Sequence, residues 1–234
     1  MIRASQNLPE RVRVVRAEIA AAAASAGRNV SDITLLAVSK AQPAEAVRAA
    51  FAAGLTDFGE SYLNEALAKL EALQDLPLTW HFIGRLQANK TRPIAERFQW
   101  VHGIDRLHIA ERLAQQRPVH APPLNVCLQV NLAGERSKAG VTPAELPALA
   151  AAVAALARLH LRGLMCIPPP ETAPQAQRAW FAQLRQLRDG LNAAGAALDT
   201  LSMGMSSDFP NAILEGSTLV RVGTALFGER PPRA

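Results

Sequence analysis

Two charged residues lie in or directly after apolar runs of this sequence, where charge is uncommon. Lys40 follows the run 33–39, Ile-Thr-Leu-Leu-Ala-Val-Ser, which is typical of a buried strand. Arg221 lies inside the apolar run 218–222. An amine held at the end of a rigid strand can condense with a carbonyl group if burial or a nearby positive charge helps it to lose its proton. Lys40 is therefore a candidate nucleophile, and a solvated lysine is the alternative.

Small and hydroxyl-bearing residues gather near Arg221 in the C-terminal part of the chain. The segment 201–208 reads Leu-Ser-Met-Gly-Met-Ser-Ser-Asp, and Gly223 and Thr224 follow the apolar run. Hydroxyls and backbone N–H groups in such loops bind phosphate, and a glycine lets the backbone approach the anion closely. Capping of the next helix by Ser and Asp is the alternative for this segment. A candidate Schiff-base lysine with a phosphate site indicates pyridoxal 5′-phosphate (PLP).

The side chain of Arg221 points into the fold if Val220 and Val222 point outward, as strand alternation predicts. A buried acid could neutralise its charge. Alternatively, the guanidinium faces the pyridine nitrogen of PLP, where its permanent charge would disfavour protonation of that nitrogen. Such a site favours holding the cofactor over carbanion chemistry.

His81 lies in the run Trp-His-Phe-Ile-Gly, residues 80–84, which predicts a buried strand. Two interpretations are open: a core histidine with satisfied hydrogen bonds, or a ring stacked against the cofactor. The remaining histidines have no metal-ligand spacing to one another or to a cysteine, so no metal site is predicted. They are His102, His108, His120 and His160.

Short apolar runs alternate with longer amphipathic stretches along the whole chain. Strands are expected at 33–39, 56–59, 79–83, 99–102, 124–131, 160–167, 198–202 and 218–222. Helices are expected at 8–27, 43–53, 61–73, 89–98, 106–116, 143–159, 175–194 and from about 211 to 215. Eight strands separated by helices predict an α/β fold, a single (β/α)8 TIM barrel with an extra N-terminal helix.

A doubly wound open sheet has the same alternation, but the strand count and the absence of a Gly-rich dinucleotide motif favour the barrel. In a barrel the loops after the strands form one ligand-binding face, so Lys40, Arg221 and the C-terminal phosphate residues should converge there. The proline-rich stretches 118–123 and 168–174 are short loops rather than linkers. Residues 1–234 are therefore expected to form one domain.

Composition excludes several classes of protein. Hydrophobic residues make up 49% of the 234 residues, which excludes a disordered chain. The net charge of +5 is dispersed, and one tyrosine and three tryptophans offer little base stacking, so nucleic-acid binding through the basic cluster 85–97 is disfavoured. No membrane span or secretory signal is recognisable, and a cytoplasmic protein is expected. Cys127 and Cys166 are isolated and should be buried, reduced thiols.

Several separated motifs resemble those of the pyridoxal phosphate homeostasis protein family. They occur in the family's order over residues 8–228, at 37–40, 80–90, 129–131, 163–165 and 201–206, with Glu135, Lys138 and Gly140 after the third and Phe227-Gly228 at the end. The resemblance implies a barrel of the alanine racemase N-terminal type. It also implies a role in PLP and vitamin B6 homeostasis, and indirectly in amino-acid balance, without an established turnover.

The resemblance also implies individual roles for site residues. Lys40 would be the Schiff-base (aldimine) lysine, and Arg221 would face the pyridine nitrogen. Ser206, Gly223 and Thr224 would surround the phosphate. The family pattern Gly-Glu-Asn-Tyr with a later Gln-Glu is altered at 59–65, where Ser61 and Asn64 are the possible replacements for the asparagine.

Two functions follow from this reading of the sequence. The first is a noncatalytic PLP carrier, expected to be a monomer, that delivers the cofactor to PLP-dependent apo-enzymes. The second is an amino-acid racemase, which needs another base opposite Lys40. Racemases that resemble this barrel take a tyrosine from an additional β domain, whereas the single tyrosine here is Tyr62, so we favour the carrier. A second, noncovalent PLP site near Lys90 and Lys138 is a further hypothesis.

Overall fold

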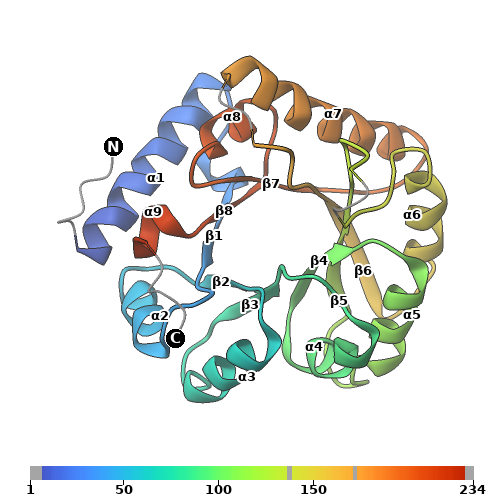
Figure 1. Ribbon diagram of the computed structural model, residues 1–234, viewed down its shortest axis with the longest axis horizontal. Helices are drawn as coiled ribbons and strands as arrows, with labels where there is room; N and C mark the ends of the chain where they lie inside the picture. The colour runs from blue at the N-terminus through green and yellow to red at the C-terminus, as the bar shows by residue number, and fades with distance from the viewer. Residues whose placement is uncertain (1–6, 136–138, 171–172, 230–234) are drawn as a thin grey trace.

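Eight parallel strands form a closed barrel in which consecutive strands pair and β8 returns to pair with β1 (Figure 1). The computed structural model describes residues 7–135, 139–170 and 173–229. The strands are β1 Thr34–Val38, β2 Asp57–Glu60, β3 Thr79–Phe82, β4 Trp100–Ile104, β5 Leu124–Gln129, β6 Leu159–Met165, β7 Thr200–Met205 and β8 Leu219–Val222. The (β/α)8 barrel predicted from the sequence is confirmed, and the open sheet is excluded.

Helices surround the barrel on its outside (Figure 1). They are α1 Leu8–Ser25, α2 Ala44–Ala52, α3 Leu63–Ala72, α4 Thr91–Arg97, α5 Leu107–Gln116, α6 Leu146–Ala154, α7 Pro174–Ala193, α8 Phe209–Leu214 and α9 Thr224–Phe227, with 3-10 turns η1 Val30–Asp32 and η2 Ala88–Lys90. The extra helix α1 begins where the Asn7 side chain accepts the Glu10 N–H, and it packs against α8 and α9. None of the described helices is both long enough and apolar enough to cross a bilayer.

The seventh strand differs from its predicted extent. It runs from Thr200 to Met205 rather than ending at residue 202, so Met203, Gly204 and Met205 are strand residues and not part of the following loop. Glycine is depleted in strands, which is why the sequence indicated a loop here. Pairing of Met205 with Arg221 of β8 extends the strand in spite of that composition. Helix α9 was not predicted, because four residues are too short to show a periodic pattern.

The two cysteines lie inside the fold. Cys127 is fully buried and Cys166 nearly so, and both are free thiols. Burial raises the pKa of each thiol to about 12. The prediction of buried, reduced packing residues is therefore confirmed, and neither thiol is suited to nucleophilic chemistry at neutral pH.

Gly163 lies where β6 packs closely against β7, so a substitution at this position tests that packing. A Cβ atom at this position would lie 1.8 Å from the carbonyl oxygen of Thr200, which belongs to the backbone and cannot move aside cheaply. We expect Gly163→Ala to lower the free energy of unfolding by about 1–3 kcal/mol or more, measured by urea denaturation. Gly190→Ala in α7, where nothing lies within 4 Å, is the control and should be neutral or stabilising. Equal stability of the two variants would contradict this packing.

Candidate cofactor-binding site

A cavity of about 1110 Å³ opens at the carboxyl end of the barrel strands. Five of the six residues predicted to bind the cofactor line it, namely Lys40, Ser206, Arg221, Gly223 and Thr224. They follow or end β1, β7 and β8, whose carboxyl ends meet at this face because the barrel is closed. The volume slightly exceeds the range of about 300–1,000 Å³ that is usual for small-molecule pockets. The cavity therefore has room for a ligand larger than a single ring.

Lys40 lies in a tight turn two residues beyond the end of β1 and is half-buried. The next residue, Ala41, has a φ of 62°, the left-handed region that a residue with a side chain rarely adopts. The Ala41 N–H donates a 2.6 Å hydrogen bond to Oε1 of Glu65 in α3, and the Gln42 N–H donates to the Ser39 carbonyl. These contacts hold the backbone on both sides of Lys40 and offset the cost of the unusual conformation.

A buried ionic cluster lies behind this turn and is called the Lys69 cluster below. It consists of Ser39, Glu60, Glu65 and Lys69. The Lys69 ammonium, 5% exposed, donates to the Ser39 carbonyl at 2.7 Å, to Glu60 Oε1 at 2.7 Å and to Glu65 Oε1 at 2.5 Å. Ser39 Oγ also donates to Glu60 Oε1 at 2.6 Å. Residues 39 and 41, on either side of Lys40, are thus both tied to one buried network.

Burial raises the pKa of Glu60 even though the neighbouring Lys69 and the hydrogen bonds act to lower it. Its second oxygen, Oε2, is buried and makes no hydrogen bond within the described part of the chain. The charge of Lys69 is therefore important for keeping this carboxylate inside the fold. The sequence alone did not reveal the cluster, because Glu65 and Lys69 are four residues apart on a helix, a spacing typical of exposed surface pairs.

The loop after β7 and the start of α9 meet at the other side of the cavity. Ser206 Oγ accepts the N–H of Gly223 at 3.2 Å and the N–H of Ala225 at 3.4 Å. Asp208 Oδ1 accepts the Met205 N–H at 2.5 Å and shapes the loop. A Cβ atom at Gly223 would lie 3.3 Å from the Val38 carbonyl oxygen, so glycine suits this close passage of two backbones. Hydroxyls and backbone N–H groups are therefore concentrated at one end of the cavity.

Arg221 lies on the cavity wall with 5% of its surface exposed. Its Nη1 donates to the carbonyl and to Oγ of Ser202 at 2.5 and 2.9 Å, and its Nη2 donates to the Cys166 carbonyl at 2.9 Å. These partners are neutral oxygens. Among the described residues no acid lies within ion-pair distance of Arg221, and Asp208 attracts its charge from farther away. The guanidinium keeps its positive charge at the floor of the cavity, since arginine is not deprotonated in proteins.

The sixth residue expected to bind the cofactor, His81, is not on the cavity wall. The His81 ring is 1% exposed and stacks on Trp100 with centroids 5.4 Å apart and planes at 7°. Its Nε2 lies 3.1 Å from Asp57 Oδ1, and its Nδ1 lies 3.0 Å from His102 Nε2. His81 is thus buried inside the barrel, as the apolar residues around it in the sequence predicted.

The segment after β2 that differs from the family pattern lies partly on the cavity wall. Ser61 lines the cavity, whereas Asn64 is exposed and lies away from the wall. Of the two replacements considered from the sequence, Ser61 is thus the one on the cavity wall. Tyr62 is 42% exposed and is likewise not on the cavity wall. Lys138, one of the two residues of the suggested second site, lies outside the described residues, and Lys90 is not on the wall.

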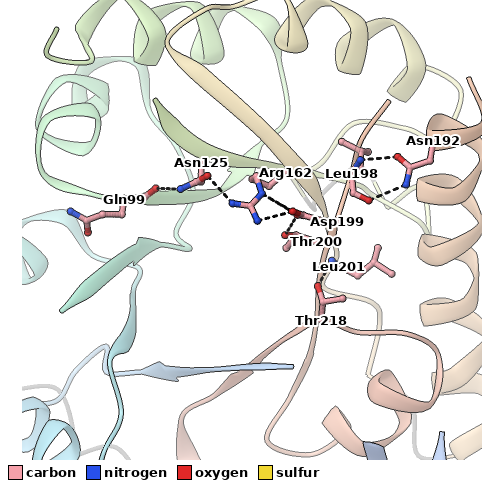
Figure 2. Close-up of polar contacts among 9 residues, drawn as sticks. All are labelled: Gln99, Asn125, Arg162, Asn192, Leu198, Asp199, Thr200, Leu201 and Thr218. Atoms are coloured by element: carbon pink, nitrogen blue, oxygen red, sulfur yellow. Dashed lines mark hydrogen bonds and ion pairs between the residues drawn. The ribbon is translucent and has the colours of Figure 1, made fainter. Parts of the chain in front are cut away.

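At the opposite end of the barrel, a belt of polar side chains joins the beginnings of four strands (Figure 2). Arg162 donates to Asp199 through Nε, which is 3.0 Å from both carboxylate oxygens, and through Nη2 at 2.7 Å, and it donates to Asn125 Oδ1 at 3.1 Å. Its guanidinium also lies over the Trp100 ring, 5.0 Å from the centroid. The Trp100 ring is therefore in contact with both Arg162 and His81.

Acidification is expected to destabilise the protein through His81 and His102. Burial lowers the pKa of His81 and lowers that of His102 well below 6.5, so both rings stay neutral when folded, while the unfolded chain takes up protons near pH 6.5. Their contribution is complete above that pH and is lost as the pH falls below it. Between pH 7.5 and 5.5 we expect a loss of about 1 kcal/mol for each ring that stays neutral, measured by urea unfolding.

The raised pKa of Glu60 acts in the opposite direction at lower pH, so a control is needed to isolate the imidazoles. His102→Gln removes one titrating ring and should reduce the difference in stability between the two pH values. An unchanged difference would mean that His102 accepts a proton in the folded state as easily as in the unfolded one.

Comparison with known families agrees with the architecture. The family model described as the alanine racemase N-terminal domain matches residues 14–231. An alanine racemase from Corynebacterium glutamicum has a similar fold, with a TM-score of 0.67 at 20% identity over 93% of this chain and 61% of the racemase. The protein is thus a barrel of the alanine racemase N-terminal class.

Full-length relatives define the family more narrowly. The chain is 61% identical over 223 residues to the pyridoxal phosphate homeostasis protein of Pseudomonas aeruginosa, covering 95% of this chain and 96% of the relative. It is 52% identical over 219 residues to that of Escherichia coli, covering 92% and 94%. The structure of PipY from Synechococcus elongatus, solved with PLP bound, has a TM-score of 0.84 at 40% identity and covers 95% and 100%. The chain belongs to the pyridoxal phosphate homeostasis protein family.

Proposed function

We propose that this protein is a PLP-binding homeostasis protein that holds the cofactor as a Schiff base on Lys40 and releases it to PLP-dependent apo-enzymes without catalytic turnover. Residues 1–234 would act as one binding unit. The observation that carries the proposal is the convergence of Lys40, Arg221 and the Ser206 loop on one cavity. The names of the relatives and the PLP bound to PipY support the same cofactor.

The cavity residues fit the chemical groups of PLP. The Lys40 amine would condense with the aldehyde of the cofactor to form an imine and release one water. Ser206, Gly223 and Thr224 would bind the phosphate through hydroxyls and backbone N–H groups. The Ser206 hydroxyl already accepts two backbone N–H groups at this end of the cavity, which supports an oxygen of the ligand binding nearby.

Two features support the absence of turnover: the charge beside the pyridine ring of PLP and the residues opposite Lys40. A permanent positive charge on Arg221 disfavours protonation of the pyridine nitrogen and so limits the ability of the cofactor to stabilise a carbanion. A racemase also needs a second base opposite Lys40. The single tyrosine of the chain, Tyr62, is not on the cavity wall.

The experiment combines spectroscopy with two activity measurements on the purified protein. PLP should produce a visible absorption band that borohydride converts into a stable adduct on the peptide containing Lys40. Transfer of PLP to an apo-aminotransferase should be faster than release of PLP into solution with a trapping agent. Equal rates would reduce the protein to a passive binder. Interconversion of alanine enantiomers at enzymatic rates would instead establish a racemase.

A further inference from the structure

We infer that Asp57, at the amino end of the barrel, is a positioning residue for Arg221 at the cofactor cavity, acting through a one-directional chain of hydrogen bonds across the barrel interior. The chain runs through His81, His102 and Ser202 and is called the barrel relay below. The effect of the relay on PLP binding rests on the proposed PLP-binding function. The positions of the protons within the relay are independent of that function, so the two parts can be tested separately.

Five strands each contribute one side chain to the relay. Asp57 Oδ1 lies 3.1 Å from His81 Nε2, and His81 Nδ1 lies 3.0 Å from His102 Nε2. His102 Nδ1 lies 2.8 Å from Ser202 Oγ, which lies 2.9 Å from Arg221 Nη1. These residues come from β2, β3, β4, β7 and β8. The four members other than Asp57 are at most 5% exposed, and the Asp57 side chain is 27% exposed.

The directions follow from the ionised Asp57 end when both imidazoles are neutral. An ionised carboxylate only accepts, so His81 donates its Nε2–H to Asp57, and its unprotonated Nδ1 accepts the Nε2–H of His102. Nδ1 of His102 then accepts the hydroxyl proton of Ser202, whose oxygen accepts from Arg221. Both histidines are then Nε2–H tautomers.

A charged histidine would break this order. A second proton on His81 would sit on Nδ1 and face the N–H of His102, so two donors would meet. A second proton on His102 would reverse the hydrogen bond with Ser202 and place a positive charge near Arg221. Burial lowers the pKa of both rings, in agreement with neutral imidazoles. Hydrogen bonds from His81 and Thr56 outweigh burial and hold the pKa of Asp57 below its ordinary value, in agreement with an anion at this end.

The relay links a buried cation to a carboxylate that does not touch it. A guanidinium with 5% exposure needs compensation, and its hydrogen-bond partners are neutral oxygens of Ser202 and Cys166. Asp208 attracts it through space, and the relay adds a second acid that is connected to it by hydrogen bonds. Aligned hydrogen bonds polarise one another, so the negative charge of Asp57 stabilises the whole alignment up to Arg221. Trp100 stacks on His81 and is itself covered by Arg162, and this packing fixes the middle of the relay.

The first test is the protonation of the ring nitrogens, measured by 15N NMR in the protein without PLP. At pH 7.5, His81 and His102 should each show a protonated Nε2 and an unprotonated Nδ1. Asp57→Ala should abolish the single tautomer of His81, whereas Asp57→Asn retains an acceptor oxygen and should preserve it. A protonated Nδ1 on either ring of the unaltered protein would overturn the relay, whether or not the protein binds PLP.

The second test is PLP affinity, which asks whether the relay positions Arg221. Asp57→Ala should weaken PLP binding by about tenfold, the effect expected when a hydrogen bond to a charged group is lost, and Asp57→Asn should restore part of it. Asp75→Ala is the matched control, since Asp75 pairs with Arg48 on the surface, with both side chains about half exposed. Unchanged affinity of folded Asp57→Ala would refute the positioning role. Failure of the unaltered protein to bind PLP would refute the proposed function and leave the NMR result standing.

Discussion

Lys40→Ala is expected to abolish the covalent attachment of PLP. Among the lysines of the described residues, Lys40 alone lines the cavity, and the turn that carries it is tied to buried groups on both sides. Without its amine no imine can form at this position, so the visible band and the borohydride-stable adduct should both disappear. PLP bound only through its phosphate and ring should dissociate faster than from the unaltered protein. Absorption spectroscopy and mass spectrometry of the reduced protein measure both effects.

Lys90→Ala is the matched control for this prediction. Lys90 ends η2, is half-buried and lies away from the cavity wall, so its removal should leave the band and the adduct unchanged. If Lys40→Ala kept the same stoichiometry of covalent PLP, Lys40 would not be the principal site. An adduct lost in Lys90→Ala instead would assign covalent attachment to Lys90 rather than Lys40.

Lys69→Met is expected to have the largest effect on stability. It removes the cation that compensates Glu60, whose side chain is fully buried, and it removes the hydrogen bond to the Ser39 carbonyl. Breaking a buried ion pair by removing one partner typically costs about 3–5 kcal/mol of the free energy of unfolding. The same change loosens Glu65, which holds the Ala41 N–H, so attachment of PLP to Lys40 should also become slower. Urea denaturation and the rate of appearance of the PLP band check the two parts.

Two variants separate the loss of charge balance from the loss of packing. Adding Glu60→Gln to Lys69→Met removes the uncompensated carboxylate and should recover part of the stability. Arg48→Met breaks an exposed ion pair with Asp75 and should cost at most about 1 kcal/mol. A loss for Lys69→Met as small as that for Arg48→Met would show that the cluster does not depend on the lysine charge.

Much of the fold could be predicted from local patterns. The eight strands lie within a few residues of their predicted positions, because each is a short apolar run bounded by polar or turn residues, as at Leu124–Gln129. The cavity could be predicted in outline for a related reason. Lys40 and Gly223 each follow a predicted strand, and a closed parallel barrel brings all strand ends to one face.

Other parts of the site depend on contacts between residues distant in sequence. A spacing of four residues, as between Glu65 and Lys69, is typical of surface pairs, and only the position of Glu60 at the end of β2 brings Lys69 into a buried cluster. Likewise, the strand pattern around His81 predicted burial but could not distinguish a core histidine from a cofactor contact. In the structure the His81 ring contacts His102 and Asp57, which come from different strands.

The sequence by itself determined the number and order of the strands, the types of reactive residues, and the face on which Lys40, Arg221 and Thr224 meet. Only the tertiary structure decided that β7 extends beyond Ser202 to Met205, that Lys69 is buried behind Lys40, and that five side chains form the barrel relay. The physical reason is that a period of two residues determines the face to which a side chain points. Its neighbours across the barrel are set by strand register and by the closure of β8 onto β1.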